Sequence, residues 1–171
     1  MTPEAICRLY DYTYWAFERV WDCIMELTDK QFTRHIDYSI GSIRHHVVHL
    51  MSGTRRGVQR ARGIEITPHL AFEKYPTREI AKAKWEGMKV EELDYIYSLN
   101  QAQLDEIVHW EIAARNLSYG NRRWELLMHV VNHATDHRAQ ILAMLHHHFG
   151  VKTTEHDMIF YLLGRADKEE R

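Results

Sequence analysis

Hydrophobic residues recur every three or four positions along four long segments of the chain. The first segment covers residues 3–27, and Thr2 and Pro3 at its start are residues that favour the beginning of a helix. Three further segments show the same spacing, at residues 43–62, 77–104 and 122–148. Because this period places the apolar side chains on one face of a helix, the pattern predicts four long amphipathic helices.

The stretches between these segments are predicted to be connections. Residues 28–41 are mostly polar, and Pro68 and Pro76 mark a loop before the third helix. Residues 105–120 alternate loosely between apolar and polar positions, which fits either a short hairpin or an irregular crossover. A short helical tail is expected over residues 157–163. The whole pattern favours an all-α fold, a four-helix bundle with a hairpin or irregular crossover before the last long helix.

Length and composition favour a single domain that covers residues 1–171. Of the 171 residues, 45% are hydrophobic and 27% are charged, which is the balance of a globular protein. The net charge of −2 provides no basic surface for nucleic acid or an anionic membrane, so we expect neither partner. The sequence has no run of 18 apolar residues and no signal-peptide pattern at its start, so we expect a cytoplasmic protein. Cys7 and Cys23 lie too far apart on one predicted helix to form a disulfide with each other.

The 13 histidines direct attention to metal chemistry. His133 and His137 are four residues apart on the fourth predicted helix, so their imidazoles share a face and can reach one metal ion. A third ligand has to come from another helix. On the second predicted helix both His46 and His49 lie on an admissible face, and the spacing alone does not choose between them.

Four segments of the chain together resemble a known family. Residues 129–140, HVVNHATDHRAQ, resemble the signature HxxNHxxxHRGQ of the DinB-like (DinB/YfiT) four-helix-bundle metalloproteins. Residues 14–16, residues 42–49 and residues 150–157 resemble three further family segments in the same order. The sequence departs from the family pattern at Asp136, where many members have another histidine, and at Ala139, where many have glycine.

The resemblance implies a site and an activity. It places the three metal ligands on His49, His133 and His137, and so favours His49 over His46. It also implies a metal-dependent enzyme that acts on a small-molecule substrate. Characterised relatives include metal-dependent enzymes that act with low-molecular-weight thiols such as bacillithiol and mycothiol, as S-transferases or isomerases. Relatives often pair through their helices, so we expect a homodimer. Trp15 and Trp21 lie on different sides of the first predicted helix. One side can pack in the bundle, and the other is then free to contact a partner chain.

Three imidazoles leave coordination positions open, as catalytic rather than structural sites do, and they favour a divalent ion such as Zn²⁺ or Ni²⁺. Such an ion lowers the pKa of a bound water or thiol, so a hydrolase is an alternative to a thiol transferase. Asp136 and Gln140 lie near the pair on the same helix and are candidate catalytic residues that orient a ligand imidazole or the substrate. The remaining alternative is a non-catalytic metal-binding stress-response module, which predicts a fourth protein ligand such as His46 or His129.

Overall fold

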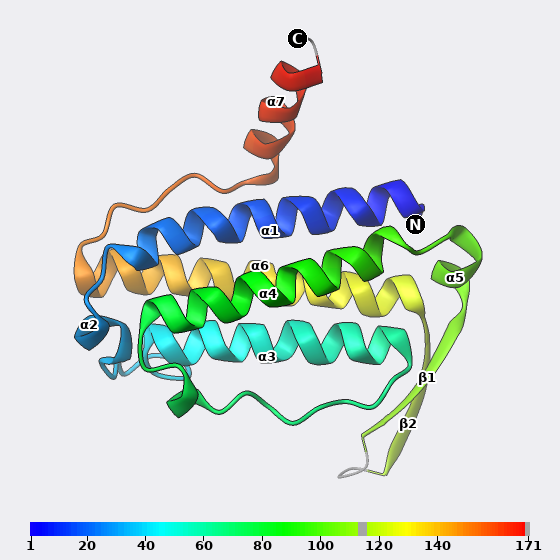
Figure 1. Cartoon of the computed structure of the whole chain (residues 1–171), viewed down its shortest axis with the longest axis horizontal. Helices are drawn as coiled ribbons and strands as arrows, with labels where there is room; N and C mark the ends of the chain where they lie inside the picture. The colour runs from blue at the N-terminus through cyan, green and yellow to red at the C-terminus, as the bar shows by residue number, and fades with distance from the viewer. Residues whose placement is uncertain (113–115, 170–171) are drawn as a thin grey trace.

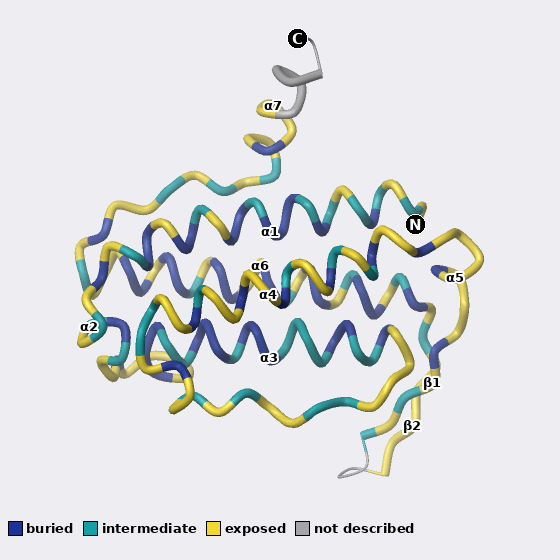
Figure 2. The backbone as a smooth tube through the Cα atoms, in the orientation of Figure 1, coloured by how far each residue is buried: buried dark blue, intermediate teal, exposed yellow. Residues whose placement is uncertain are grey.

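Four long helices lie side by side and form most of the molecule (Figure 1). This computed structural model describes residues 1–112 and 116–169, with side chains up to residue 164. The long helices are α1 (Pro3–Met25), α3 (Ile43–Arg62), α4 (Arg78–Tyr97) and α6 (Arg123–Phe149). Both α1 and α3 pack against α4 and α6, so the four helices surround a shared core. Figure 2 shows their buried residues on the sides that face one another.

The ends of the long helices are fixed by the residues that the sequence indicates. Thr2, Ser42 and Thr77 each accept a hydrogen bond from a backbone N–H in the first turn of α1, α3 and α4, at 3.1–3.3 Å. Gly63 and Gly150 follow α3 and α6 with φ angles of 69° and 67°. This left-handed conformation suits glycine and ends the helix. The predicted second and fourth helices therefore have nearly the predicted bounds.

Two predicted boundaries are wrong because short capped helices interrupt them. The predicted connection 28–41 contains α2 (Asp29–Thr33), which begins with a reciprocal cap between Thr28 and Gln31. The third helix was predicted to reach residue 104, but α4 ends at Tyr97. Asn100 then accepts a hydrogen bond from the N–H of Gln103 at 3.0 Å and starts a separate helix, α5 (Gln101–Asp105). The first helix also ends two residues earlier than predicted.

The crossover before α6 is a two-stranded antiparallel sheet. Strand β1 (Ile107–Ile112) pairs with β2 (Leu117–Arg122), with Ile107 opposite Arg122. Of the two alternatives for this stretch, the hairpin is therefore the one found, although residues 113–115 between the strands lie outside the described residues. The class is mostly helical with this one small sheet among the described residues.

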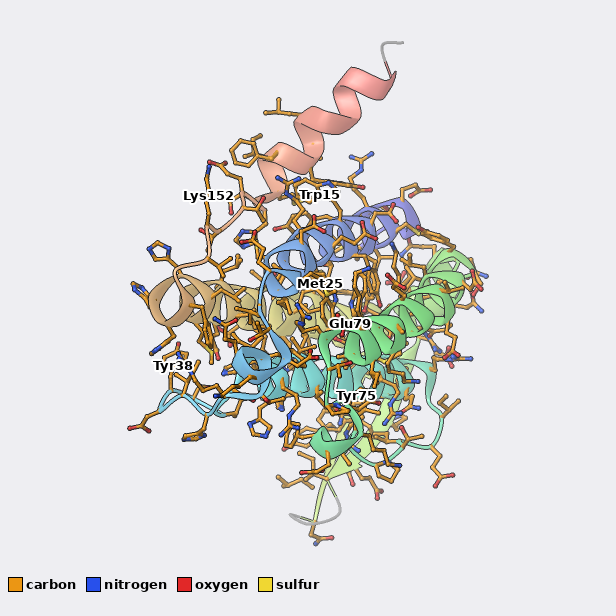
Figure 3. The ribbon with its side chains drawn as sticks, turned by 60° about the vertical axis from the view of Figure 1, so that its left-hand side comes forward. Trp15, Met25, Tyr38, Tyr75, Glu79 and Lys152 are labelled. Atoms are coloured by element: carbon orange, nitrogen blue, oxygen red, sulfur yellow. The ribbon has the colours of Figure 1, made fainter. Side chains whose placement is uncertain are left out.

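The last helix, α7 (Met158–Glu169), stands away from the four long helices and touches α1 (Figure 1). Tyr161 packs against Tyr12 and Trp15 of α1, with ring centroids 5.9 and 5.6 Å apart, and Figure 3 shows Trp15 at this junction. Trp21 is fully buried in the core, so it cannot supply the second apolar side that we expected for contact with a partner chain.

A short 3₁₀ helix, η1 (Phe72–Lys74), lies in the loop before α4. No described helix is long and apolar enough to cross a membrane.

Candidate metal centre

Three histidines from two helices converge where α3 packs against α6. His49 comes from α3, and His133 and His137 come from successive turns of α6. Each offers one ring nitrogen, and these three nitrogens all lie within 4.8 Å of one another. The ring centroids are 4.5 Å apart for His133 and His137, 4.7 Å for His49 and His137, and 5.5 Å for His49 and His133. The three residues therefore lie close enough to bind one metal ion.

The approach of α3 to α6 depends on glycine. A Cβ atom on Gly53 would lie 2.4 Å from Cε1 of His133, which is closer than side chains allow. One turn further along α3, a Cβ atom on Gly57 would lie 2.4 Å from Cγ2 of Val130 in α6. Because the two glycines have no side chain, the ring of His133 and the side chain of Val130 pack directly against the backbone of α3. The glycines hold His133 over the helix that carries His49.

Burial keeps the three imidazoles neutral, which is the form that binds metal. Burial and then the neighbouring His137 and His49 lower the pKa of His133 to about 4. Burial also lowers the pKa of His49, and burial together with His49 lowers that of His137. Asp136 acts in the opposite direction on both α6 histidines. At neutral pH the cluster therefore presents lone pairs rather than positive charge.

The donor set fits a borderline divalent ion. Nδ1 of His133 and Nδ1 of His137 are buried, and neither has a hydrogen-bond partner among the described residues. Buried polar atoms without a partner are costly, and an ion bound through these nitrogens would relieve this cost. Imidazole donors suit Zn²⁺ and Ni²⁺ better than they suit Ca²⁺ or Mg²⁺.

The other candidate histidines lie outside this cluster. His46 is fully buried, with its ring 6.0 Å from that of His137 and stacked on Tyr38 at 6.3 Å. His129 is exposed, one turn before His133, with a centroid separation of 6.1 Å. His45 serves the start of its own helix, where its Nδ1 accepts a hydrogen bond from the N–H of Ser42 at 3.3 Å. The spacing left His46 and His49 open, and the cluster contains His49.

Asp136 and Gln140 form a polar pair beside the cluster on the solvent side. Nε2 of Gln140 donates to Oδ2 of Asp136 at 3.0 Å, and the hydroxyl of Ser39 donates to Oε1 of Gln140 at 3.3 Å. Ser39 lies in the segment before α3, next to Tyr38 (Figure 3). The ring of Tyr38 stacks on that of His46. The pair thus links α6 to the segment that precedes α3. The catalytic roles of Asp136 and Gln140 stay predictions.

Sequence reasoning missed the two glycines. Gly53 and Gly57 are four residues apart in a predicted helix, and glycine is unfavourable inside helices. That spacing places both on one face, which is a signal of a close helix-to-helix approach. This signal lies in the same predicted helix as His49, so the sequence could have indicated that this helix packs closely against another.

Comparison with known proteins gives two matches. A profile of a family described as the DinB family matches residues 1–169. The protein named Protein DinB from Bacillus subtilis (strain 168) is 29% identical over 150 residues, which cover 81% of this chain and 83% of that protein. The family match spans both helices that carry the histidine cluster.

Proposed function

The chain belongs to the DinB family, and from this premise we propose that it is a divalent-metal-dependent enzyme that transfers a low-molecular-weight thiol to an electrophilic substrate. The convergence of His49, His133 and His137 is the observation that carries the proposal. With three protein ligands, positions for exogenous ligands stay open, which is the pattern of catalytic zinc sites. We propose Zn²⁺ or Ni²⁺ as the ion.

In the proposed reaction, a bond forms between the thiol sulfur and the electrophile while the bond to its leaving group breaks. The thiol proton departs with the leaving group or with solvent. A bound divalent ion would supply Lewis acidity that lowers the pKa of a thiol or water. We propose that Gln140 and Asp136 orient the substrate beside the cluster, because they are hydrogen-bonded to each other at its solvent side.

The proposal extends to the scaffold and the assembly. We take residues 1–171 as one domain, a four-helix bundle, supported by the packing of α1 and α3 against α4 and α6. We also propose a homodimer in which α7 takes part. Four large apolar side chains of α7 are exposed, namely Ile159, Phe160, Leu162 and Leu163. A twelve-residue helix with such a surface is more stable when a second chain covers it.

A substrate panel tests the activity. The protein, loaded in turn with Zn²⁺ and with Ni²⁺, is incubated with small thiols and a chromogenic electrophile, and in parallel with ester and amide substrates. We expect metal-dependent turnover in the thiol series, lost in His137→Ala and kept in His129→Ala, which changes an exposed histidine on the same helix. Turnover in the ester or amide series alone would indicate a hydrolase.

A non-catalytic metal-binding module is the other outcome of this panel. It requires that neither series turns over and that a fourth protein ligand fills the coordination sphere. His46 is the residue to test, because both of its ring nitrogens are buried without a hydrogen-bond partner among the described residues. Loss of metal in His46→Ala, together with an inactive wild-type protein, would support the module and overturn the enzyme.

A further inference from the structure

A cavity lies at the centre of the four long helices, apart from the histidine cluster. Its volume, counted as the space open to the centre of a water molecule, is ≈ 30 Å³. Residues of α1, α3, α4 and α6 line it, and none of the three cluster histidines is among the lining residues described. The walls are mainly aromatic rings and methionine side chains, with one carboxyl group: Tyr14, Phe17, Met51, Trp85, Met88 and Glu92.

Glu92 has an oxygen without a partner. The residue is only 5% exposed, and its Oε2 accepts a hydrogen bond from the hydroxyl of Tyr14. Its Oε1 is buried and has no hydrogen-bond partner among the described residues. When Glu92 is protonated, its hydrogen can be shared with the hydroxyl of Tyr14, and Oε1 still lacks a partner. When Glu92 is ionised, the carboxylate has no counter-charge within ion-pair distance among the described residues. The ionised state therefore calls for a cation in the cavity, and the neutral state leaves one oxygen without a partner.

Water can bond to the polar groups of this cavity but leaves its apolar walls without a partner. A buried water molecule uses two to four polar partners. The hydroxyl of Tyr10 donates to the carbonyl oxygen of Leu127, and that of Thr13 donates to the carbonyl oxygen of Leu9. Beyond these, the polar lining reduces to Glu92 with Tyr14 and the hydroxyl of Thr54. Most directions from a water molecule in this space would meet carbon or sulfur.

An organic cation suits the same walls. The ring of Trp85 lies 5.8 Å from that of Tyr14 and 5.4 Å from that of Phe17, centroid to centroid, so three rings cluster beside Glu92. Aromatic faces attract cations, and the attraction strengthens when the cation is desolvated. The carboxylate provides the opposite charge, while the methionines contact an alkyl group. Burial raises the pKa of Glu92 to about 7, so at neutral pH the group can release its proton when a cation arrives.

We propose that this cavity is a binding site for a small alkylammonium ion, with Glu92 as its counter-charge and Tyr14, Phe17 and Trp85 as its aromatic walls. The volume limits the ligand to about two or three non-hydrogen atoms, because one water needs roughly 10–15 Å³ by the same measure. Methylammonium has this size. None of the three cluster histidines lines the cavity, so the proposal does not rest on metal binding or on the proposed thiol transfer.

Titration with methylammonium chloride tests the site on the metal-loaded full chain. Tryptophan fluorescence is the readout, since Trp85 lies in the cavity wall. We expect a saturable change with methylammonium and none with sodium chloride at equal ionic strength. Methanol, which has the same number of non-hydrogen atoms and no charge, should also give no saturable change.

Two variants of neighbouring residues on α4 locate the response. Glu92→Gln keeps the size of the side chain and removes its charge, and we expect at least about tenfold weaker binding. Asp94→Asn removes an exposed carboxylate two residues further along the helix and should bind as the wild type does. Circular dichroism checks that both variants fold.

Three results would overturn the proposal: no saturable response in the wild type, an equal response to methanol, or unchanged binding in folded Glu92→Gln. The comparison of methylammonium with methanol uses the wild-type protein, so it tests the proposed cation site even when Glu92→Gln does not fold. The metal-free protein should bind methylammonium with the same affinity. Failure of the proposed thiol transfer therefore leaves this test intact, and the reverse also holds.

Discussion

Two interior regions of this molecule hold buried ionisable groups, and they differ in how many such groups meet. At the contact of α3 with α6, three imidazole nitrogens lie within 4.8 Å of one another. In the central cavity, Glu92 is the one carboxyl group in an aromatic lining. Burial favours the neutral form in both regions, since it lowers the pKa of His133 to about 4 and raises that of Glu92 to about 7.

The comparison separates burial from convergence. Burial alone shifts a pKa towards the neutral form wherever the group lies, so a shifted pKa does not identify a metal site. Convergence of several lone pairs on one point does, because a single ion can then satisfy all of them. A lone carboxyl group in an apolar cavity instead requires one small partner of opposite charge.

The largest expected effect is the loss of metal when convergence is broken. His137→Ala should bind Zn²⁺ more than about 100-fold more weakly, since loss of an outer partner of a ligand already costs roughly 10–100-fold. Competition with a coloured chelator measures the affinity. His129→Ala is the control on the same helix. Retention of full metal in His137→Ala, with loss in His129→Ala or His46→Ala, would contradict the ligand set.

The pH dependence of the two regions should have opposite signs. In the metal-free protein, stability contributed by His133 is present above its unfolded pKa of 6.5 and is lost as the pH falls through about 4. Stability contributed by Glu92 is present below its unfolded pKa of 4.5 and is lost as the pH rises through about 7. A shift of this size in a buried group corresponds to about 3 kcal/mol.

Glu92→Gln isolates the second contribution. Between pH 4.5 and 7 we expect the stability of this variant, relative to the wild type, to rise with pH. Urea unfolding of the metal-free protein, in buffers without primary amines, measures the difference. A constant difference across this pH range would show that Glu92 is ionised in the folded protein throughout.

Gly53 tests whether the close approach of the helices maintains the metal centre. Gly53→Ala places a Cβ atom against His133, and overpacking of this kind costs about 1–3 kcal/mol. We expect lower stability and weaker Zn²⁺ binding together. Gly87→Ala in α4 is the matched control, because nothing lies within 4 Å of its added Cβ. Better helix propensity should then stabilise the protein by about 0.5–1 kcal/mol. Equal metal affinity in the two variants would refute the role of Gly53.

The smallest expected effect concerns the hydrogen bond in the cavity. Tyr14→Phe removes the hydroxyl that donates to Glu92 and should cost about 0.5–1.5 kcal/mol. It should also raise the pKa of Glu92 further, because this hydrogen bond lowers it. Urea unfolding below pH 4.5 and near pH 7 measures both quantities, and metal affinity should not change. A change in metal affinity would mean that the two regions are coupled.

The helices were largely predictable because their signals are local. Apolar spacing and the caps at Ser42 and Thr77 lie within a few residues of the boundaries that they set. The same apolar spacing hid the break after Tyr97, since Leu99 and Leu104 continue the pattern across it. Only the cap at Asn100 marks that break, and its partner Gln103 is an ordinary helix residue.

The candidate site was predictable in part. The pair His133 and His137 follows from helical spacing, whereas the choice of His49 came from the resemblance to a family. Spacing does not contain the distance between two helices, so the role of Gly53 was missed. Glu92 did leave a local signal, because it occupies a buried position one turn after Met88 on the apolar face of α4.

The position of the cluster in the chain has a consequence for how the protein is made. One histidine of the cluster is residue 49 and the other two are residues 133 and 137, so about half of the chain separates them. A nascent chain emerges N-terminus first, and contacts between distant residues form late because a long loop must close. During translation the second long helix leaves the ribosome well before its partner exists. The three histidines therefore come together late, at or after the end of translation, and a chain truncated before residue 133 would carry His49 without the cluster.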